Sequence, residues 1–423
     1  MNNRPDRYAR RQKSMFDKTQ NGQKPESTVD ALKAIFNRNF TVVALINLIE
    51  MTAYYLTFVT STAYARSIFD ISLSAAGLTA GIMVIGCLVG RFVTGNLISL
   101  FGSPRILFGG LLLFAASFVF DFVVTSLPLL YLQRFMAGVG VGVVGTATGT
   151  IVAYVVPLRF HGLGISMFTL STALALALGP FLGIALSQWS GYEVLNIFCL
   201  ISALLCLFFY FFLKGLPETR HKHRPFIDLY SYIDPRVVRF SLVAVITCLG
   251  YGCIQAFMPS LAMERGLTAE SSIYFLLYGI AAICTRPMVG RIFDLRGENI
   301  IFYPCLILTS LALFLLANAQ AGWMLLLSAI FMGIGFGNFQ SAGQAVSLSL
   351  VSRSRFAQAT TTFFVFFDLG IGMGPYIFGF LVPAVGYNGM YNALAAVEIV
   401  ALVLYYFLHG RNGARRRGHR RTK

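Results

Sequence analysis

The chain has 423 residues, of which 57% are hydrophobic and only 12% are charged, and its formal net charge is +16. Soluble globular proteins are roughly 25% charged, so this composition excludes an ordinary soluble enzyme, a disordered protein and a disulfide scaffold. It indicates a protein that crosses a membrane several times.

Twelve stretches of the chain are long and apolar enough to span a bilayer, for which a helix needs about 20 residues. In chain order they cover residues 40–64, 73–98, 105–126, 128–155, 160–187, 192–213, 236–262, 268–293, 300–317, 322–348, 355–382 and 388–408. They predict an all-α membrane protein with twelve transmembrane helices.

The positive charge is concentrated in three regions that flank these stretches. Residues 1–39, 214–239 and 409–423 together hold 22 basic and 7 acidic residues, which account for 15 of the 16 net charges. An even number of spans places both ends on one side, and an excess of Lys and Arg marks the cytoplasmic side. We therefore expect a multi-pass cell-membrane protein with both termini in the cytoplasm. The C-terminal arginines directly follow an apolar stretch, so we expect them to meet membrane lipids and not nucleic acid.

The chain also contains an internal repeat. A shift of 195 residues superposes two halves of the sequence without gaps over about a hundred positions. The superposed pairs include Arg91 with Arg286, Gly95 with Gly290, Gly102 with Gly297, Gly138 with Gly333, and Gly179-Pro180 with Gly374-Pro375. Each half then has six helices that enter from the same side, which predicts two pseudo-symmetric six-helix bundles. The expected division is a basic tail at 1–39, bundles at 40–213 and 236–408, a cytoplasmic linker at 214–235 and a basic tail at 409–423.

Four local motifs resemble the major facilitator superfamily, and most closely its drug:proton antiporter branch of twelve-helix multidrug efflux proteins, over residues 40–408. The loop motif Gly-x-Leu-Ala-Asp-Arg-x-Gly-Arg has its first copy at residues 95–102, where Ser99 replaces the acid, and its second at 290–297, where Asp294 keeps it. In the family this acid helps to close the cytoplasmic face.

The other three motifs lie in or after later helices. Arg134 resembles the buried helix-four arginine that the family links to proton coupling, and Gly179-Pro180 opens a partial copy of the antiporter Gly-Pro motif. Leu216–Arg220 is similar to the Pro-Glu-Thr element of sugar porters. From the motifs and the repeat, the predicted conformational-gating residues are Arg91, Gly95, Gly102, Arg286, Gly290, Asp294, Gly297, Gly179, Pro180, Gly374 and Pro375.

Charged residues inside spans are functional candidates, because burying charge in hydrocarbon is costly. We expect Glu50, Arg134 and Asp368 to couple protons, since a carboxyl holds its proton more tightly when buried and less tightly beside an arginine. The proposed exchange is between Glu50 and Arg134. Glu50 bonded to a neighbouring helix, and Asp368 as a structural partner or as a ligand of a cationic group, are open alternatives.

Polar and aromatic side chains near these charges form the expected substrate site. Glu50 shares one face of its helix with Asn47, Tyr54, Thr57 and Ser61, and this stripe is expected to line a water-filled cavity. The predicted substrate-binding residues are Asn47, Tyr54, Thr57, Tyr251, Gln255, Asn338 and Gln344. Aromatic rings with a few polar groups suit an amphipathic ligand.

The sequence therefore predicts a proton-coupled secondary transporter that exports a small amphipathic molecule by alternating access. An importer or symporter of a nutrient such as a sugar, an organic acid or a nucleoside is the alternative, and a membrane receptor or enzyme is a remote one. Clustered catalytic or metal-ligating residues are not evident, and the seven cysteines lie in apolar stretches. We expect no enzymatic activity, no metal, no cofactor beyond a proton gradient, and a monomer.

Overall fold

The computed structural model describes residues 35–157, 161–215, 233–351 and 355–411. Most of the two basic tails, most of the central linker and the Leu216–Arg220 motif lie outside these residues. The described part is helical, and it contains twelve stretches that are long and apolar enough to cross a membrane. The predicted all-α membrane fold is confirmed.

The helices follow one another with short connections. They are α3 (Arg38–Ile68), α4 (Leu73–Phe101), α5 (Ser103–Asp121), α6 (Leu127–Val155), α7 (His161–Tyr210), α8 (Pro235–Glu264), α9 (Thr268–Arg296), α10 (Asn299–Ala317), α11 (Gly322–Ser349), α12 (Phe356–Gly379), α13 (Val382–Tyr405) and the π-helical turn η4 (Tyr406–Gly410). Helix α7 comprises two spans, Met167–Trp189 and Gly191–Tyr210.

Local sequence signals explain several of the helix ends. The side chains of Asn37 and Ser72 accept hydrogen bonds from the first-turn amides of α3 and α4. Asp234 does the same at the start of α8. Gly102 ends α4 and Gly297 ends α9, each with a φ of +83°, a conformation that glycine adopts without steric cost.

The backbone reproduces the sequence repeat. Gly102 and Gly297 are 195 residues apart, and so are Gly191 (φ 76°) and Gly386 (φ 69°), which break α7 and α13. Side-chain packing repeats as well: Gly138 of α6 lies against Met83 of α4, and its counterpart Gly333 of α11 lies against Tyr278 of α9. Residues that are 195 positions apart make corresponding contacts, which confirms two pseudo-symmetric halves.

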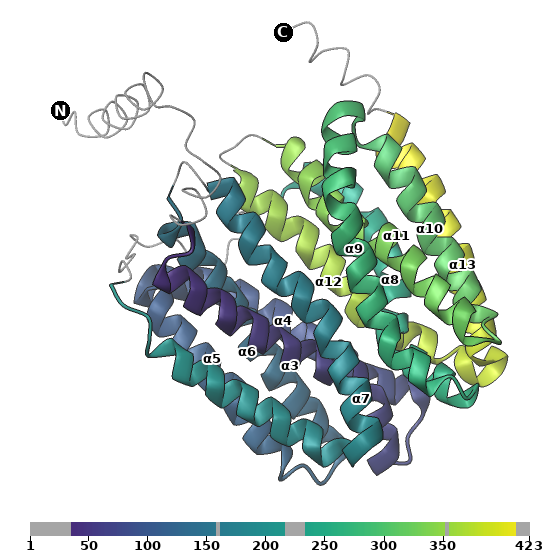
Figure 1. Ribbon diagram of the computed structural model, residues 1–423, viewed down its shortest axis with the longest axis horizontal. Coiled ribbons are helices and arrows are strands. Elements are labelled where there is room, and N and C mark those ends of the chain that lie inside the picture. The colour runs from purple at the N-terminus through teal and green to yellow at the C-terminus, as the bar shows by residue number, and fades with distance from the viewer. Residues whose placement is uncertain (1–34, 158–160, 216–232, 352–354, 412–423) are drawn as a thin grey trace, which may run out of the picture.

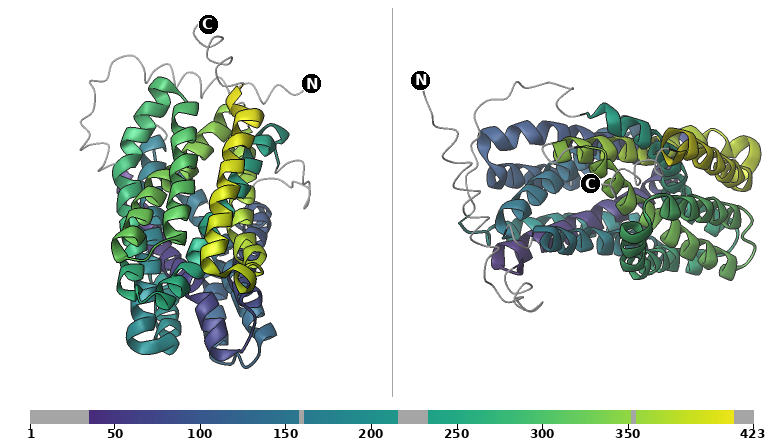
Figure 2. Two further views of the ribbon diagram at one scale, coloured as in Figure 1. Left: turned by 90° about the vertical axis from the view of Figure 1, so that its right-hand side faces the viewer. Right: turned by 90° about the horizontal axis from the view of Figure 1, so that it is seen from above.

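The two halves lie side by side as an N-terminal bundle (α3–α7) and a C-terminal bundle (α8–η4), as Figures 1 and 2 show. The C-terminal bundle has one continuous apolar core that includes Tyr251, Phe257 and Phe336. Helix α3 begins and α13 ends at the upper side of Figure 1, here called the terminal face, and the opposite side is called the distal face.

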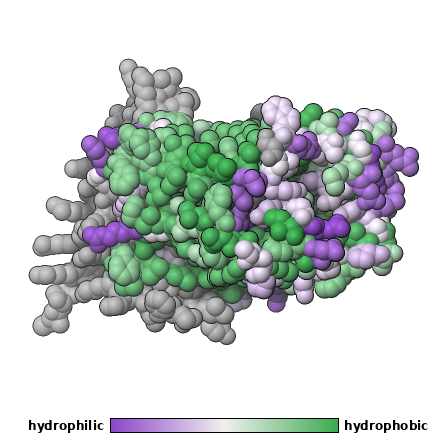
Figure 3. Space-filling view, turned by 90° about the horizontal axis from the view of Figure 1, so that it is seen from below, coloured by the Kyte–Doolittle hydropathy of each residue, from purple (hydrophilic) through white to green (hydrophobic). Residues whose placement is uncertain are grey.

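The outer surface is rich in exposed apolar side chains, as expected for a body surrounded by lipid. Ile201, Phe208, Phe314 and Val400 are each more than half exposed. Figure 3 views the distal face, where apolar residues cover broad areas and polar residues gather at the side of the C-terminal bundle. Burial of so much apolar surface in lipid accounts for the composition that excluded a soluble protein.

Candidate functional site

The two bundles meet where α4 packs against α12. In the distal half of the interface, Ser74 Oγ donates a hydrogen bond of 3.1 Å to the carbonyl of Tyr376. A methyl group on Gly81 would lie 2.6 Å from the carbonyl oxygen of Gly372, and one on Gly77 would lie 2.7 Å from that of Pro375. Small residues let the two backbones approach this closely, so the distal half of this interface is closed.

An ion pair joins the bundles at the inner end of this contact. Nη1 of Arg91 on α4 lies 3.0 Å from Oδ2 of Asp368 on α12. Asp368 is the twelfth residue after the start of α12, and Arg91 is ten residues before the end of α4, so both lie about 15–18 Å from the terminal ends of their helices. The pair therefore stands near the middle of the membrane.

Glu50 lies at a similar depth, twelve residues after the start of α3. Its side chain is fully buried, and neither carboxylate oxygen has a hydrogen-bond partner. Burying a carboxyl group without a partner is costly for its ionised form, so Glu50 is a candidate for binding a proton.

Arg134 is buried in α6, away from Glu50. Its Nε donates to Ser61 Oγ across 3.2 Å and its guanidinium lies 5.4 Å from the centre of the Tyr64 ring, while Nη1 has no partner. Ser61 is eleven residues beyond Glu50 on α3, which is about 16 Å along the helix. In this structure Arg91, and not Arg134, is the arginine that lies at the depth of Glu50. The exchange between Glu50 and Arg134 during the transport cycle stays a prediction.

The polar stripe of α3 is packed inside the N-terminal bundle. Asn47 Nδ2 donates to Ser171 Oγ at 2.8 Å and to Thr172 Oγ1 at 2.9 Å on α7, and Thr57 lies 3.4 Å from Cys199 Sγ. The Tyr54 ring makes an edge contact with Tyr55. Thr57 lines a small cavity together with Arg134 and Asn196, and the expectation that the whole stripe faces water stays a prediction.

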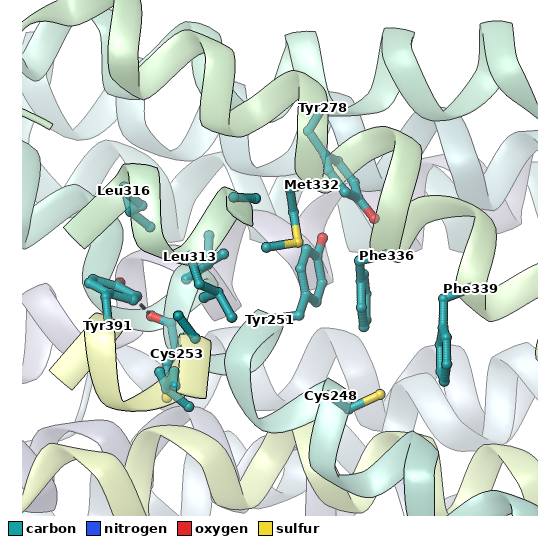
Figure 4. Close-up of a cluster of buried hydrophobic side chains, with 14 of the residues drawn as sticks. Cys248, Tyr251, Cys253, Tyr278, Leu313, Leu316, Met332, Phe336, Phe339 and Tyr391 are labelled. Atoms are coloured by element: carbon teal, nitrogen blue, oxygen red, sulfur yellow. Dashed lines mark hydrogen bonds between the residues drawn. The ribbon is translucent and has the colours of Figure 1, made fainter. Parts of the chain in front are cut away.

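The C-terminal bundle contributes an aromatic group near the interface. The Tyr251 ring stacks on Phe336 with centroids 4.2 Å apart and lies 5.4 Å from the Tyr278 ring, an arrangement visible in Figure 4. Gln255, one turn along α8 from Tyr251, is buried with no partner for its amide nitrogen. The unpaired amide nitrogen of Gln255 thus lies one helical turn from the stacked ring of Tyr251.

The two predicted polar residues of α11 differ in their surroundings. Asn338 is buried and donates to Thr285 Oγ1 at 2.8 Å and to the Ile334 carbonyl at 2.9 Å, while its Oδ1 has no partner. Gln344 is half-buried. Arg286 of α9 also faces α11, where its Nη2 lies 3.4 Å from the Gly337 carbonyl.

The remaining predicted gating residues have different surroundings. Gly179 lies against Thr52 and Tyr55 of α3, while Gly374 lies against Leu249 of α8. Pro180 and Pro375 lie inside α7 and α12. Gly290 faces open space, and Gly102 and Gly297 are the helix-ending glycines described above. The side-chain surroundings of Gly95 and Asp294 lie outside the described residues.

Sequence reasoning undervalued Arg91, which it placed among the gating residues near a loop. The length of α4, 29 residues, is the signal that was available: it is longer than a span requires, so a residue ten positions from its end still lies deep. Within the described residues there is also no group of three or more potential metal ligands.

Comparison with known proteins agrees with this architecture. The family model described as Major Facilitator Superfamily matches residues 43–325 and 299–423. The chain belongs to the Major Facilitator Superfamily. It is 24% identical over 356 residues to the uncharacterized MFS-type transporter YhhS of Shigella flexneri, which covers 82% of this chain and 87% of that protein. It is 22% identical over 353 residues to the uncharacterized MFS-type transporter MJ1560 of Methanocaldococcus jannaschii, and the match covers 81% of this chain and 91% of that protein.

Solved structures of the superfamily share the fold at low identity. A point mutant of the nucleoside transporter NupG has a TM-score of 0.74 and 14% identity, with 88% of this chain and 100% of that chain covered. A bacterial homologue of the human lysosomal transporter Spinster, in an inward-facing and unoccupied conformation, has a TM-score of 0.73 and 14% identity, with 93% and 99% covered. This superfamily member is therefore a multi-pass membrane transporter.

Proposed function

We propose that this superfamily member is a proton-coupled transporter, of the drug:proton antiporter type, that exports a small amphipathic molecule across the cell membrane, with both termini in the cytoplasm. The observation that carries the proposal is the Arg91–Asp368 ion pair, which joins the bundles at mid-depth beside the unpaired carboxyl of Glu50. Three ionisable groups at one level provide a place where a proton changes which groups are paired.

The proposed cycle uses Arg91 as the shared partner of two carboxyls. A proton that reaches Asp368 removes the negative charge that holds Arg91, and the ion pair between the bundles is lost. This proton comes from Glu50, and Arg91 then stabilises the ionised Glu50, which lies on its own side of the interface. The bundles separate at the distal face, the substrate leaves, and Glu50 takes up a proton from that side. Asp368 then releases its proton toward the terminal face, the ion pair with Arg91 re-forms and the distal face closes, so that a proton moves inward as the substrate moves outward. Arg134, farther toward the distal face, supports this cycle by ordering α3 against α6.

Export is supported by the packing of the partial Gly-Pro motif. Gly179 lies against the backbone of α3 one turn from Glu50, and Pro180 interrupts the hydrogen-bond pattern of α7 beside it. A rearrangement at Glu50 is thus linked directly to the bend of α7. The substrate site proposed between the bundles comprises Tyr251, Gln255, Asn338 and Gln344 from the C-terminal bundle, with Asn47, Tyr54 and Thr57 behind Glu50.

Inverted membrane vesicles provide the test. A proton gradient is generated by respiration, and acridine-dye fluorescence reports its partial collapse when each compound of a toxicant panel is added. We expect at least one amphipathic compound to collapse the gradient with the wild-type protein, and neither Glu50→Gln nor Asp368→Asn to respond to it. Equal responses of both variants and the wild type would refute the coupling assignment. Collapse on addition of nutrients to right-side-out vesicles, with no response in inverted ones, would instead support an importer.

A further inference from the structure

The structure contains a second arginine at the position that is equivalent to Arg91. Arg286 lies 195 residues after Arg91, in α9, and α9 packs against α7 as α4 packs against α12. The contacts around the two arginines correspond residue by residue: Val84 lies against Gly372 in one interface, and Gly279 lies against Ala177 in the other. These contacts establish the register of both interfaces.

The register identifies the residue that should pair with Arg286. Arg91 is seven residues after Val84, and its partner Asp368 is four residues before Gly372. Counting the same steps in the other interface leads from Gly279 to Arg286 and from Ala177 to Ala173. The second arginine therefore faces an alanine where the first faces an aspartate.

No described residue neutralises the charge of Arg286. Among the described residues, no carboxylate forms an ion pair with it; Nη2 reaches only the Gly337 carbonyl at 3.4 Å, and Nε has no partner. An unpaired arginine inside a membrane protein is costly unless it faces water or an anion. Its side chain is half-buried, so part of it is exposed and open to a small molecule.

We propose that Arg286 binds the oxyanion group, a carboxylate or a phosphate, of the transported molecule. A guanidinium presents two parallel N–H donors that match both groups. Ser171 and Thr172 directly precede Ala173 on α7, and Thr285 precedes the arginine on α9. The two equivalent arginines thus have different tasks. Arg91, which faces Asp368, takes part in proton coupling, and Arg286, which faces Ala173, binds the substrate. This assignment rests on the proposed transport function but is independent of its direction.

The test places the missing acid opposite the arginine. Purified protein in detergent is titrated with benzoate and with phenyl phosphate, with benzamide as the neutral match, and binding is followed by the shift in unfolding temperature. We expect the anions to bind the wild type and benzamide not to. Ala173→Asp should weaken anion binding at least about tenfold by occupying Arg286, while Ala173→Asn, which has the same size without the charge, should keep it.

Two further variants separate charge from structure. Arg286→Gln should lose anion binding, and Arg286→Lys should keep part of it. Failure of both anions to bind better than benzamide, or undiminished binding by Ala173→Asp, overturns the proposal. Because binding is measured without a proton gradient, these outcomes do not depend on whether Glu50 and Asp368 couple protons.

Discussion

Removal of the Arg91–Asp368 ion pair should shift the protein from the distal-closed conformation toward one that is open at the distal face. Asp368→Asn keeps the shape of the side chain and removes its charge. The pair is 3.0 Å long, and the two side chains are 37% and 16% exposed. Two opposite unit charges about 4 Å apart attract each other by about 4 kcal/mol at the effective dielectric constant near a protein surface. Partial exposure of Arg91 reduces this to about 1–2 kcal/mol, which changes the ratio of the two conformations about 5- to 30-fold.

Pulsed electron paramagnetic resonance measures this shift without knowledge of the substrate. Ile68 ends α3 and Met263 lies in the last turn of α8, so the two residues report on opposite bundles at the distal face; they are 52% and 71% exposed, and spin labels there do not disturb the core. In protein with Cys284 replaced, Asp368→Asn should increase the population of long distances between the labels.

Two controls make this result specific. Asp121→Asn removes another buried carboxyl, one that lies within the N-terminal bundle, and should leave the distances unchanged. The exchange Arg91→Asp with Asp368→Arg restores an ion pair of reversed polarity and should recover the short distances. An unchanged distribution in Asp368→Asn, or no recovery in the exchanged protein, would show that the ion pair does not hold the bundles together.

Three further predictions concern individual contacts. Gly81→Ala places a methyl group 2.6 Å from the Gly372 carbonyl and should lengthen the same label distance, whereas Gly109→Ala, where the methyl meets nothing within 4 Å, should not. Arg265→Ala removes bonds to the carbonyls of Leu316, Ala317 and Ala319 at the end of α10, and should lower the free energy of unfolding by about 2 kcal/mol in thermal denaturation, with exposed Arg296→Ala as the unaffected control. Glu50→Gln should leave the unfolding temperature equal or higher, since the carboxyl has no partner to lose; a drop of more than a few degrees would show that Glu50 is structural.

Much of the fold followed from local sequence properties. Hydropathy and length located the twelve spans, because a bilayer imposes the same requirement on every helix. The 195-residue repeat predicted the pairing of Gly102 with Gly297 and of Gly179 with Gly374, because a repeated sequence folds into repeated contacts. The clustering of polar residues on one face of α3 was likewise correct as a pattern, although it did not reveal which neighbour that face would meet.

The partners of the buried charges were decided only by the tertiary structure. Arg91 and Asp368 are 277 positions apart in the sequence and meet because α4 and α12 pack through small residues. The sequence alone suggested Arg134 as the partner of Glu50, since both lie in spans of the same bundle, but depth along the helices separates them. Helix period and hydropathy describe one helix at a time, whereas an ion pair depends on the relative register of two. The contrast between Asp368 opposite Arg91 and Ala173 opposite Arg286 became visible once both registers were known.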